Sequence, residues 1–199
     1  MIAIIDYGMG NLRSVQKALE YLDVPSKITS DIEEIKNSSK IIIPGVGAFP
    51  DAMENMKKMG LDIVVKEEAK KGKGILGICL GMQLLFEESE EIIKCEGLGL
   101  FKGSIKKIKG NVKVPHMGWN NLIFEEDCRL LYGVKEGSYV YFVHSYYAEI
   151  GQEKILNAYT LYDRKIPGIV SKDNVFGMQF HPEKSGDCGI KMLKNFGEL

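Results

Sequence analysis

The segment GILGICLGMQLLF, residues 74–86, constrains the fold more than any other part of the sequence. It is apolar almost throughout, and it predicts a buried strand that runs directly into a helix. Cys79 stands at the junction, with a glycine two residues to either side. A fully apolar strand followed at once by a helix is typical of a parallel sheet covered on both faces. Cys79 is therefore either a small apolar residue at a tight corner or a nucleophile that the corner exposes.

The rest of the N-terminal half repeats this alternation of strand and helix. Apolar strands are predicted at IAIID and KIIIPG, the second stopped by Pro44 and Gly45, with a weaker strand at SKITS. Helical periodicity covers residues 11–22 and a region from about 51 to 71 that Gly60 interrupts. We therefore expect an α/β fold with an open, largely parallel sheet flanked by helices.

The pattern changes after Cys95. Short β-like runs, separated by turn residues, occupy the region from Leu98 to Phe180: SIKKI, NLIF, SYVYFVHSYYAE, ILNAYTLY, GIVSK and VFGMQF. They predict an antiparallel or mixed β portion that extends the same sheet, before a closing helix at CGIKMLKNF. One domain over residues 1–199 is the economical interpretation.

Composition excludes several classes of partner. The formal net charge of −1 gives no electrostatic reason to expect nucleic acid or an anionic membrane surface. No apolar run approaches the roughly 20 residues that span a bilayer, and the start MIAIID is expected to be a first strand and not a signal peptide. The four scattered cysteines favour a reducing cytoplasm over a disulfide framework.

No cofactor or metal is expected. Gly8-Met9-Gly10 follows a predicted strand, but Arg13 stands where a dinucleotide fingerprint needs its third glycine. The spacing of the three histidines does not support a metal site.

The corner at Cys79 has the form of a nucleophile elbow. Small residues at Gly77 and Gly81 allow a tight strand-to-helix turn, which exposes the thiol at the carboxyl edge of the sheet. A helix N-terminus there would favour the thiolate. The N–H of Leu80 could then stabilise an oxyanion. Residues 77–81 alone favour a packing role and a catalytic role for Cys79 equally.

His181 and Glu183 supply the base that such a nucleophile needs. Pro182 favours an extended conformation at His181. Side chains two residues apart in an extended segment share a face, with Cα atoms roughly 6.5 Å apart. A carboxylate at that spacing can orient an imidazole. Cys79, His181 and Glu183 together predict a Cys-His-Glu triad.

The other two histidines are weaker candidates for the base. His144 and His116 have no carboxylate at a comparable spacing, so both rank below His181. His144 lies in an aromatic strand and is either a core or a site residue.

The segment IPGVGAF offers the second half of an oxyanion hole. Val46 follows a buried strand and lies between Gly45 and Gly47, so its peptide can adopt or exchange unusual conformations. A simple strand-ending turn is the alternative.

These motifs resemble the triad family of glutamine amidotransferases. GICLGMQ, PGVGAF and QFHPEKSG carry the resemblance, which covers essentially the whole chain. Two further segments, IIDYGMGNLRSVQKAL and VPHMGWNNL, look like the glutaminase subunits of imidazole glycerol phosphate synthase. The resemblance implies a flavodoxin-like α/β fold and hydrolysis of glutamine by Cys79, with His181 relaying the proton and Glu183 orienting His181.

The resemblance also implies substrate and partner contacts. The glutamine contacts are expected at Gly47, Gln83, Glu91, Ser145 and Tyr146, although the neighbouring acids of the EESEE run are interchangeable with Glu91 by eye. The expected partner is a separate cyclase subunit, a TIM barrel that forms a heterodimer with this chain and makes imidazole glycerol phosphate and AICAR in histidine biosynthesis. The docking face is expected at Asn11, Trp119, Tyr141 and Lys184.

Two other functions share the same residues. A freestanding cysteine hydrolase or peptidase would use Cys79 and His181 without a partner. A binding module with a relic elbow would leave Cys79 no more reactive than the other cysteines. We also expect the isolated glutaminase to be nearly inactive, because the peptide at Val46 would point its N–H away from the oxyanion until the partner and its ligand bind.

Overall fold

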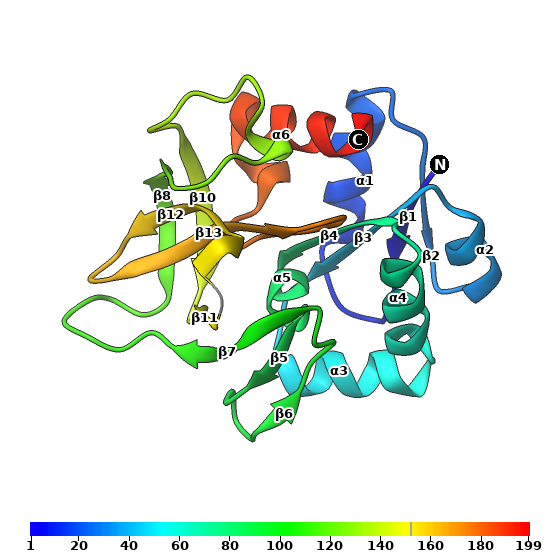
Figure 1. Ribbon diagram of the computed structural model, residues 1–199, viewed down its shortest axis with the longest axis horizontal. Helices are drawn as coiled ribbons and strands as arrows, with labels where there is room; N and C mark the ends of the chain where they lie inside the picture. Colours follow the sequence, from blue (N-terminus) through cyan, green and yellow to red (C-terminus); the bar gives the residue numbers. More distant parts are fainter. Residues whose placement is uncertain (152) are drawn as a thin grey trace.

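An eight-stranded mixed sheet forms the centre of the molecule, in the order β2-β1-β3-β4-β14-β13-β12-β9. The computed structural model describes residues 1–151 and 153–199. The first five strands in that order are parallel, and β13, β12 and β9 continue the sheet in antiparallel fashion (Figure 1). The strands of this sheet are β1 (Ile2–Ile5), β2 (Ser26–Thr29), β3 (Lys40–Gly45), β4 (Gly74–Cys79), β9 (Ile123–Phe124), β12 (Leu156–Leu161), β13 (Lys165–Lys172) and β14 (Val175–Met178).

Helices cover both faces of the sheet, which confirms the predicted α/β class. Alternate residues of β3 point to opposite faces, so that Ile41 and Ile43 join one core cluster and Ile42 joins the other. One face packs against α1 (Leu12–Tyr21) and α6 (Gly186–Glu198). The other face packs against α2 (Ile32–Asn37), α3 (Phe49–Lys58), α4 (Leu61–Lys70) and α5 (Leu80–Leu84).

The predicted helices and strands of the N-terminal half are confirmed, with local differences. Gly60 adopts a left-handed conformation with φ 69° and separates α3 from α4. β3 has the predicted extent and ends at Gly45, and Pro44 and Gly45 still pair with Ile78 and Cys79 of β4. The short helix α2 lies between β2 and β3, where no helix was predicted.

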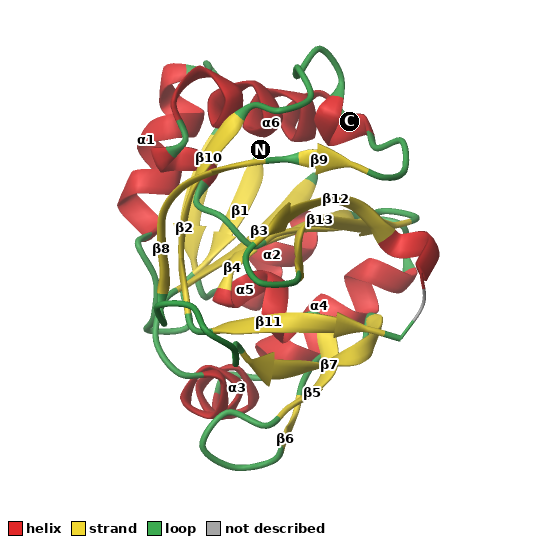
Figure 2. Cartoon of the chain, turned by 90° about the vertical axis from the view of Figure 1, so that its left-hand side faces the viewer, coloured by secondary structure: helices red, strands yellow, loops and turns green. Residues whose placement is uncertain are grey.

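The C-terminal β-rich region extends the main sheet only in part. Two further sheets stand beside it, one of four strands in the order β11-β7-β5-β6 and one of two antiparallel strands, β10 and β8 (Figure 2). Their strands are β5 (Phe86–Ser89), β6 (Cys95–Glu96), β7 (Phe101–Lys107), β8 (His116–Asn121), β10 (Tyr139–His144) and β11 (Tyr146–Ile150). The expectation that all these runs join one sheet was therefore wrong. A bend at Ser145 separates β10 from β11, and the two halves of the run pair in different sheets.

Among the described residues, no helix is long and apolar enough to cross a membrane.

Candidate active site

Cys79 occupies a strained corner between β4 and α5. Its backbone has φ 55° and ψ −111°, in a region that residues with a side chain rarely adopt. The corner needs glycines on both sides. A Cβ on Gly77 would lie 2.5 Å from the Gly81 carbonyl oxygen, and a Cβ on Gly81 would lie 1.7 Å from the Ile43 carbonyl oxygen. Strain at one residue, held by close packing around it, is the form expected of a nucleophile elbow.

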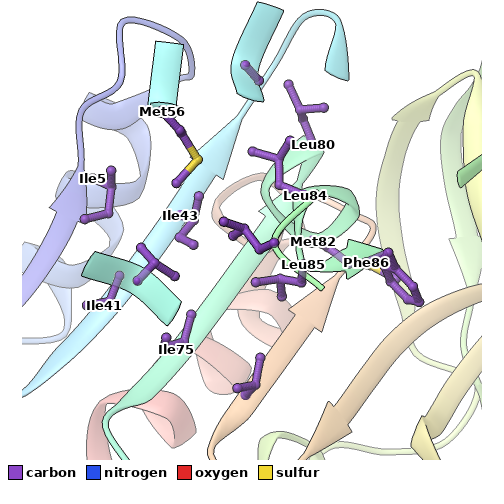
Figure 3. Close-up of a cluster of buried hydrophobic side chains, with 14 of the residues drawn as sticks. Ile5, Ile41, Ile43, Met56, Ile75, Leu80, Met82, Leu84, Leu85 and Phe86 are labelled. Carbon is purple, nitrogen blue, oxygen red and sulfur yellow. The ribbon is translucent and has the colours of Figure 1, made fainter. Parts of the chain in front are cut away.

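Apolar packing holds the corner in place. Leu80, Met82, Leu84 and Leu85 are buried in the core cluster that also contains residues of β3 and β4 (Figure 3). The helix α5 is only five residues long, so its dipole is weaker than that of a longer helix. The free N–H groups of its first turn remain a local source of positive potential.

His181 and Glu183 form a buried pair. His181 Nδ1 lies 2.9 Å from Glu183 Oε1, and the two side chains are 4% and 1% exposed. His181 is extended, as Pro182 predicted, but Glu183 belongs to the 3-10 turn η3 (Pro182–Lys184) and not to an extended segment. The turn brings the carboxylate to the imidazole, so the pair forms by a different backbone route from the one expected.

The electrostatics of this pair favour a charged imidazole. Burial alone would lower the pKa of His181, but the Cys79 sulfur and the Glu183 carboxylate outweigh it and raise the pKa to about 10. With Nδ1 bonded to Glu183, His181 Nε2 is buried without a hydrogen-bond partner among the described residues. The imidazolium therefore keeps one N–H that is free to act on a group bound beside the thiol.

A cavity of about 360 Å³ opens over Cys79 and His181. It collects the residues predicted for the reaction and for glutamine binding, except Glu183, which bonds to His181 from outside the cavity lining. The predicted residues that line it are Val46, Gly47, Cys79, Leu80, Gln83, Glu91, Ser145, Tyr146 and His181. A larger groove of about 830 Å³, between residues 124–133 and the end of α6, contains none of them.

Two of the predicted substrate residues are held by hydrogen bonds. Gln83 Nε2 donates to the Tyr146 carbonyl oxygen and to Gln179 Oε1, both at 3.0 Å. Glu91 Oε2 accepts a hydrogen bond from the Phe49 N–H at 2.8 Å. Burial raises the pKa of Glu91, and the hydrogen bond from Phe49 opposes that shift.

The residues predicted for a docking face lie outside the cavity. Trp119 and Tyr141 are paired across the β8–β10 sheet, with ring centroids 6.0 Å apart, and Trp119 is 56% exposed. The Tyr141 carbonyl oxygen accepts a hydrogen bond from the His181 N–H at 3.0 Å, which connects this sheet to the segment that carries the imidazole. Lys184 is exposed on η3, and Asn11 stands at the N-cap position of α1.

Several further residues contact the site and were not predicted to belong to it, among them Pro115 and Val143, which line the cavity. Gln179 is fully buried, and its Nε2 lies 3.9 Å from the Cys79 sulfur. The Tyr7 hydroxyl donates to the Pro44 carbonyl oxygen at 2.7 Å, at the start of the predicted oxyanion segment. His144, which the sequence left open between core and site, lines the cavity. The QFHPEKSG motif contains Gln179 and could have indicated it, whereas no local pattern indicates the contact of Tyr7.

Comparison with known proteins identifies the fold and the family of the chain. The sequence matches the family Glutamine amidotransferase class-I over residues 3–198. The crystal structure of a glutamine amidotransferase superposes over 100% of both chains with a TM-score of 0.79 at 17% identity. The structure of PurLQS from Thermotoga maritima superposes with a TM-score of 0.75 at 20% identity, over 98% of this chain and 96% of that one. These structural likenesses concern the fold, and the family match defines the class: the chain belongs to the class-I glutamine amidotransferases.

Relatives with higher sequence identity define a family within this class. The chain is 56% identical, over 100% of its length and 98% of the relative, to imidazole glycerol phosphate synthase subunit HisH of Caldanaerobacter subterraneus subsp. tengcongensis. It is also 56% identical to the protein of that name from Bacillus cereus (strain G9842), over 98% of this chain and 93% of the relative. Within its class, the chain therefore belongs to the family of HisH subunits.

Proposed function

We propose that this chain hydrolyses glutamine to glutamate and ammonia with Cys79 as the nucleophile. The observation that carries the proposal is the meeting of three features in one place: the strained elbow at Cys79, the buried His181–Glu183 pair, and the raised pKa of His181. A charged imidazole beside a thiolate is the form in which a cysteine is activated for acyl transfer. The family membership supports glutamine as the acyl donor.

The reaction proceeds in two steps, formation of a thioester and its hydrolysis. The Cys79 thiolate attacks the side-chain amide carbon of glutamine, and His181 gives its Nε2 proton to the departing nitrogen, so that ammonia leaves and a thioester forms. Neutral His181 then removes a proton from water, which attacks the thioester and releases glutamate and the thiolate. Glu183 fixes the orientation of the imidazole throughout and stabilises its charged form. The backbone N–H groups of Leu80 and Val46 serve as the oxyanion donors.

Glutamine would be held by the other residues of the cavity. Glu91 is assigned to the substrate amino group, and Gln83 and Gly47 to contacts along its side chain. The peptides at Ser145 and Tyr146 are assigned to the carboxylate. The position of these five residues in the cavity lining supports the assignments.

The ammonia is delivered to a cyclase subunit that makes imidazole glycerol phosphate and AICAR in histidine biosynthesis, in the cytoplasm. We expect a heterodimer with a TIM-barrel partner. The docking face that we assign to it consists of the exposed Trp119, the half-buried Tyr141 that contacts it, Asn11 and Lys184. Aromatic anchors are enriched at the centres of protein interfaces, which supports this choice.

The peptide at Val46 is the proposed switch of this glutaminase. Val46 lines the cavity and is 45% exposed. The peptide that carries its N–H joins Gly45 to Val46, and Gly45 has no side chain to restrain that peptide. Binding of the cyclase and its nucleotide ligand would favour the orientation that points the Val46 N–H at the oxyanion.

The test is a glutaminase assay of the purified chain alone, with the cyclase subunit, and with the cyclase subunit and its nucleotide ligand. We expect little hydrolysis by the chain alone and a large increase when both additions are present. Glutaminase turnover that is high in the isolated chain and unchanged by the cyclase would instead support a freestanding cysteine hydrolase. Absence of glutamine hydrolysis under all three conditions would refute the proposed activity.

A further inference from the structure

A chain of hydrogen bonds runs through two buried histidines that the proposed reaction does not use. His144 Nδ1 lies 2.7 Å from the Tyr146 carbonyl oxygen, and His144 Nε2 lies 2.9 Å from His116 Nδ1. His116 Nε2 in turn lies 3.3 Å from Asn120 Nδ2. These hydrogen bonds therefore lead from strand β8 to the carbonyl group of Tyr146, which lines the cavity.

The two end contacts of this hydrogen-bond chain determine which ring nitrogen carries each proton. A carbonyl oxygen only accepts, so the hydrogen at the first contact is on His144 Nδ1. If His144 is neutral, its Nε2 is bare and accepts from His116 Nδ1–H. His116 Nε2 is then bare too, and accepts from the Asn120 amide. The direction of that amide is fixed independently, because Asn120 Oδ1 accepts the Asn121 N–H at 2.9 Å and its Nδ2 also donates to the Leu161 carbonyl oxygen at 3.2 Å.

The surroundings keep both rings neutral. The His116 ring is stacked on Phe142 and on Tyr162, with centroids 4.7 Å and 4.0 Å away. Burial lowers the pKa of His116 to about 4. Burial also lowers the pKa of His144, to about 3. A neutral pair has one donor and one acceptor per ring, which is what the chain of contacts requires.

The hydrogen-bond chain ends on the carbonyl group of Tyr146, beside the cavity. Gln83 Nε2 donates to the same Tyr146 carbonyl oxygen that His144 contacts, so two donors from different elements converge on it. Ser145, the residue at the bend, lies between His144 and Tyr146 and lines the cavity. The contact of His144 with the carbonyl two residues ahead closes this bend and sets the direction of its peptides.

We propose that His116 is a positioning residue for glutamine binding, which acts by fixing the tautomer of His144 and, through it, the bend at Ser145–Tyr146. This inference rests on the proposed function, because the bend supplies the peptides assigned to the carboxylate of glutamine. Asn120 forms the far end of this hydrogen-bond chain, or relay, and it lies on the same strand that exposes Trp119 to solvent. The sequence spacing of the two histidines does not reveal the relay, because they meet only through the antiparallel register of β8 and β10, in which His116 stands opposite His144.

Two substitutions at His116 separate its hydrogen bond from its packing. His116→Phe keeps an aromatic ring between Phe142 and Tyr162 but removes the donor to His144. His116→Asn removes the ring but keeps an amide donor near the position of Nδ1. The matched control is Tyr162→Phe, which retains the stacked ring and removes a hydroxyl that bonds to the Lys113 carbonyl oxygen at 2.7 Å, outside the relay.

Glutaminase kinetics in complex with the cyclase and its ligand provide the readout. Loss of one neutral hydrogen bond changes an equilibrium by roughly 3- to 10-fold. We expect His116→Phe to raise KM for glutamine by about that factor with kcat within about twofold, and His116→Asn and Tyr162→Phe to remain close to the wild type. An unchanged KM in His116→Phe, or equal impairment of both His116 variants, would overturn the positioning role.

A direct observation of the protons makes the test independent of activity. Nitrogen NMR of the folded wild-type chain with labelled histidine should show His116 and His144 as neutral rings protonated at Nδ1. Protonation at Nε2 in either ring, or a charged ring at neutral pH, would contradict the relay even in a fully active protein. If the wild-type complex hydrolyses no glutamine, the proposed function fails, while the NMR spectrum still decides whether the relay exists.

Discussion

Mild acid should destabilise this protein through the buried pair His116–His144. Both rings have folded-state pKa values well below the value of about 6.5 for an exposed histidine, namely about 4 and about 3. Between these values and about 6.5, the unfolded chain binds protons that the folded chain does not. Stability contributed by the two neutral rings is therefore complete above about pH 6.5 and is lost as the pH falls toward the folded-state values.

The magnitude follows from the linkage relation. Between about pH 6 and about pH 5, each ring accounts for a loss of roughly 1.2 kcal/mol in the free energy of unfolding, or about 2.4 kcal/mol for the pair. His181 has a raised pKa of about 10, so its stabilising contribution is lost only as the pH rises above about 6.5. Its contribution changes little in the chosen interval, which leaves the buried pair as the main contribution from histidine. A loss of about 2.4 kcal/mol is a substantial fraction of a typical domain stability of about 5–15 kcal/mol.

Urea unfolding at the two pH values measures this loss. His116→Phe removes one of the two buried titrating rings and should reduce the pH-dependent loss by about 1.2 kcal/mol, whatever its effect on stability at pH 6. Tyr162→Phe should retain the wild-type difference, because it leaves both imidazoles in place. Equal pH-dependent losses in the wild type and in His116→Phe would show that His116 is not buried as a neutral ring.

Three further substitutions test other parts of the structure. Glu183→Gln should lower the glutaminase kcat of the complex by about 10²- to 10⁴-fold, since the imidazole loses the carboxylate that orients and charges it; a kcat within threefold of the wild type would contradict that role. Tyr7→Phe should lower the free energy of unfolding in urea by about 1–3 kcal/mol, because the Pro44 carbonyl oxygen loses a buried donor at 2.7 Å; an unchanged unfolding midpoint would show that this bond contributes no net stability. Trp119→Ala should weaken binding of the cyclase by about 30-fold, as expected for an aromatic anchor that contributes about 2 kcal/mol, while glutaminase activity at saturating cyclase changes little; an unchanged Kd would remove Trp119 from the docking face.

Local sequence patterns predict most of the main sheet. Buried strands such as β3 and β4 are continuous apolar runs, and α1 has clear helical periodicity, so each element is visible within a few neighbouring residues. The two smaller sheets are not visible in this way. Their assignment depends on which strands pair, and the parallel pairing of β5 with β7 or the separation of β10 from β11 at Ser145 leaves no periodic signal.

The residues of the site also fall into two groups, those that a short sequence motif indicates and those that only the assembled fold brings into contact. The glycines around Cys79 and the His181-Pro182-Glu183 triplet indicated chemistry because each is a short motif with a direct physical reason. The hydrogen bond of Tyr7 to the Pro44 carbonyl oxygen joins residues 37 positions apart, and its partner is a backbone atom that any sequence would offer. Contacts of that kind follow from the assembled fold and not from the residue types alone.

The Cys79→Ala variant tests whether Cys79 makes ammonia from glutamine for a second subunit. Cys79→Ala in complex with the cyclase should make imidazole glycerol phosphate at a normal rate from added ammonium salts and at no measurable rate from glutamine. A variant that still uses glutamine would show that Cys79 is not the nucleophile. Loss of the ammonium-dependent reaction, in a complex that still assembles, would contradict the division of labour between the two subunits.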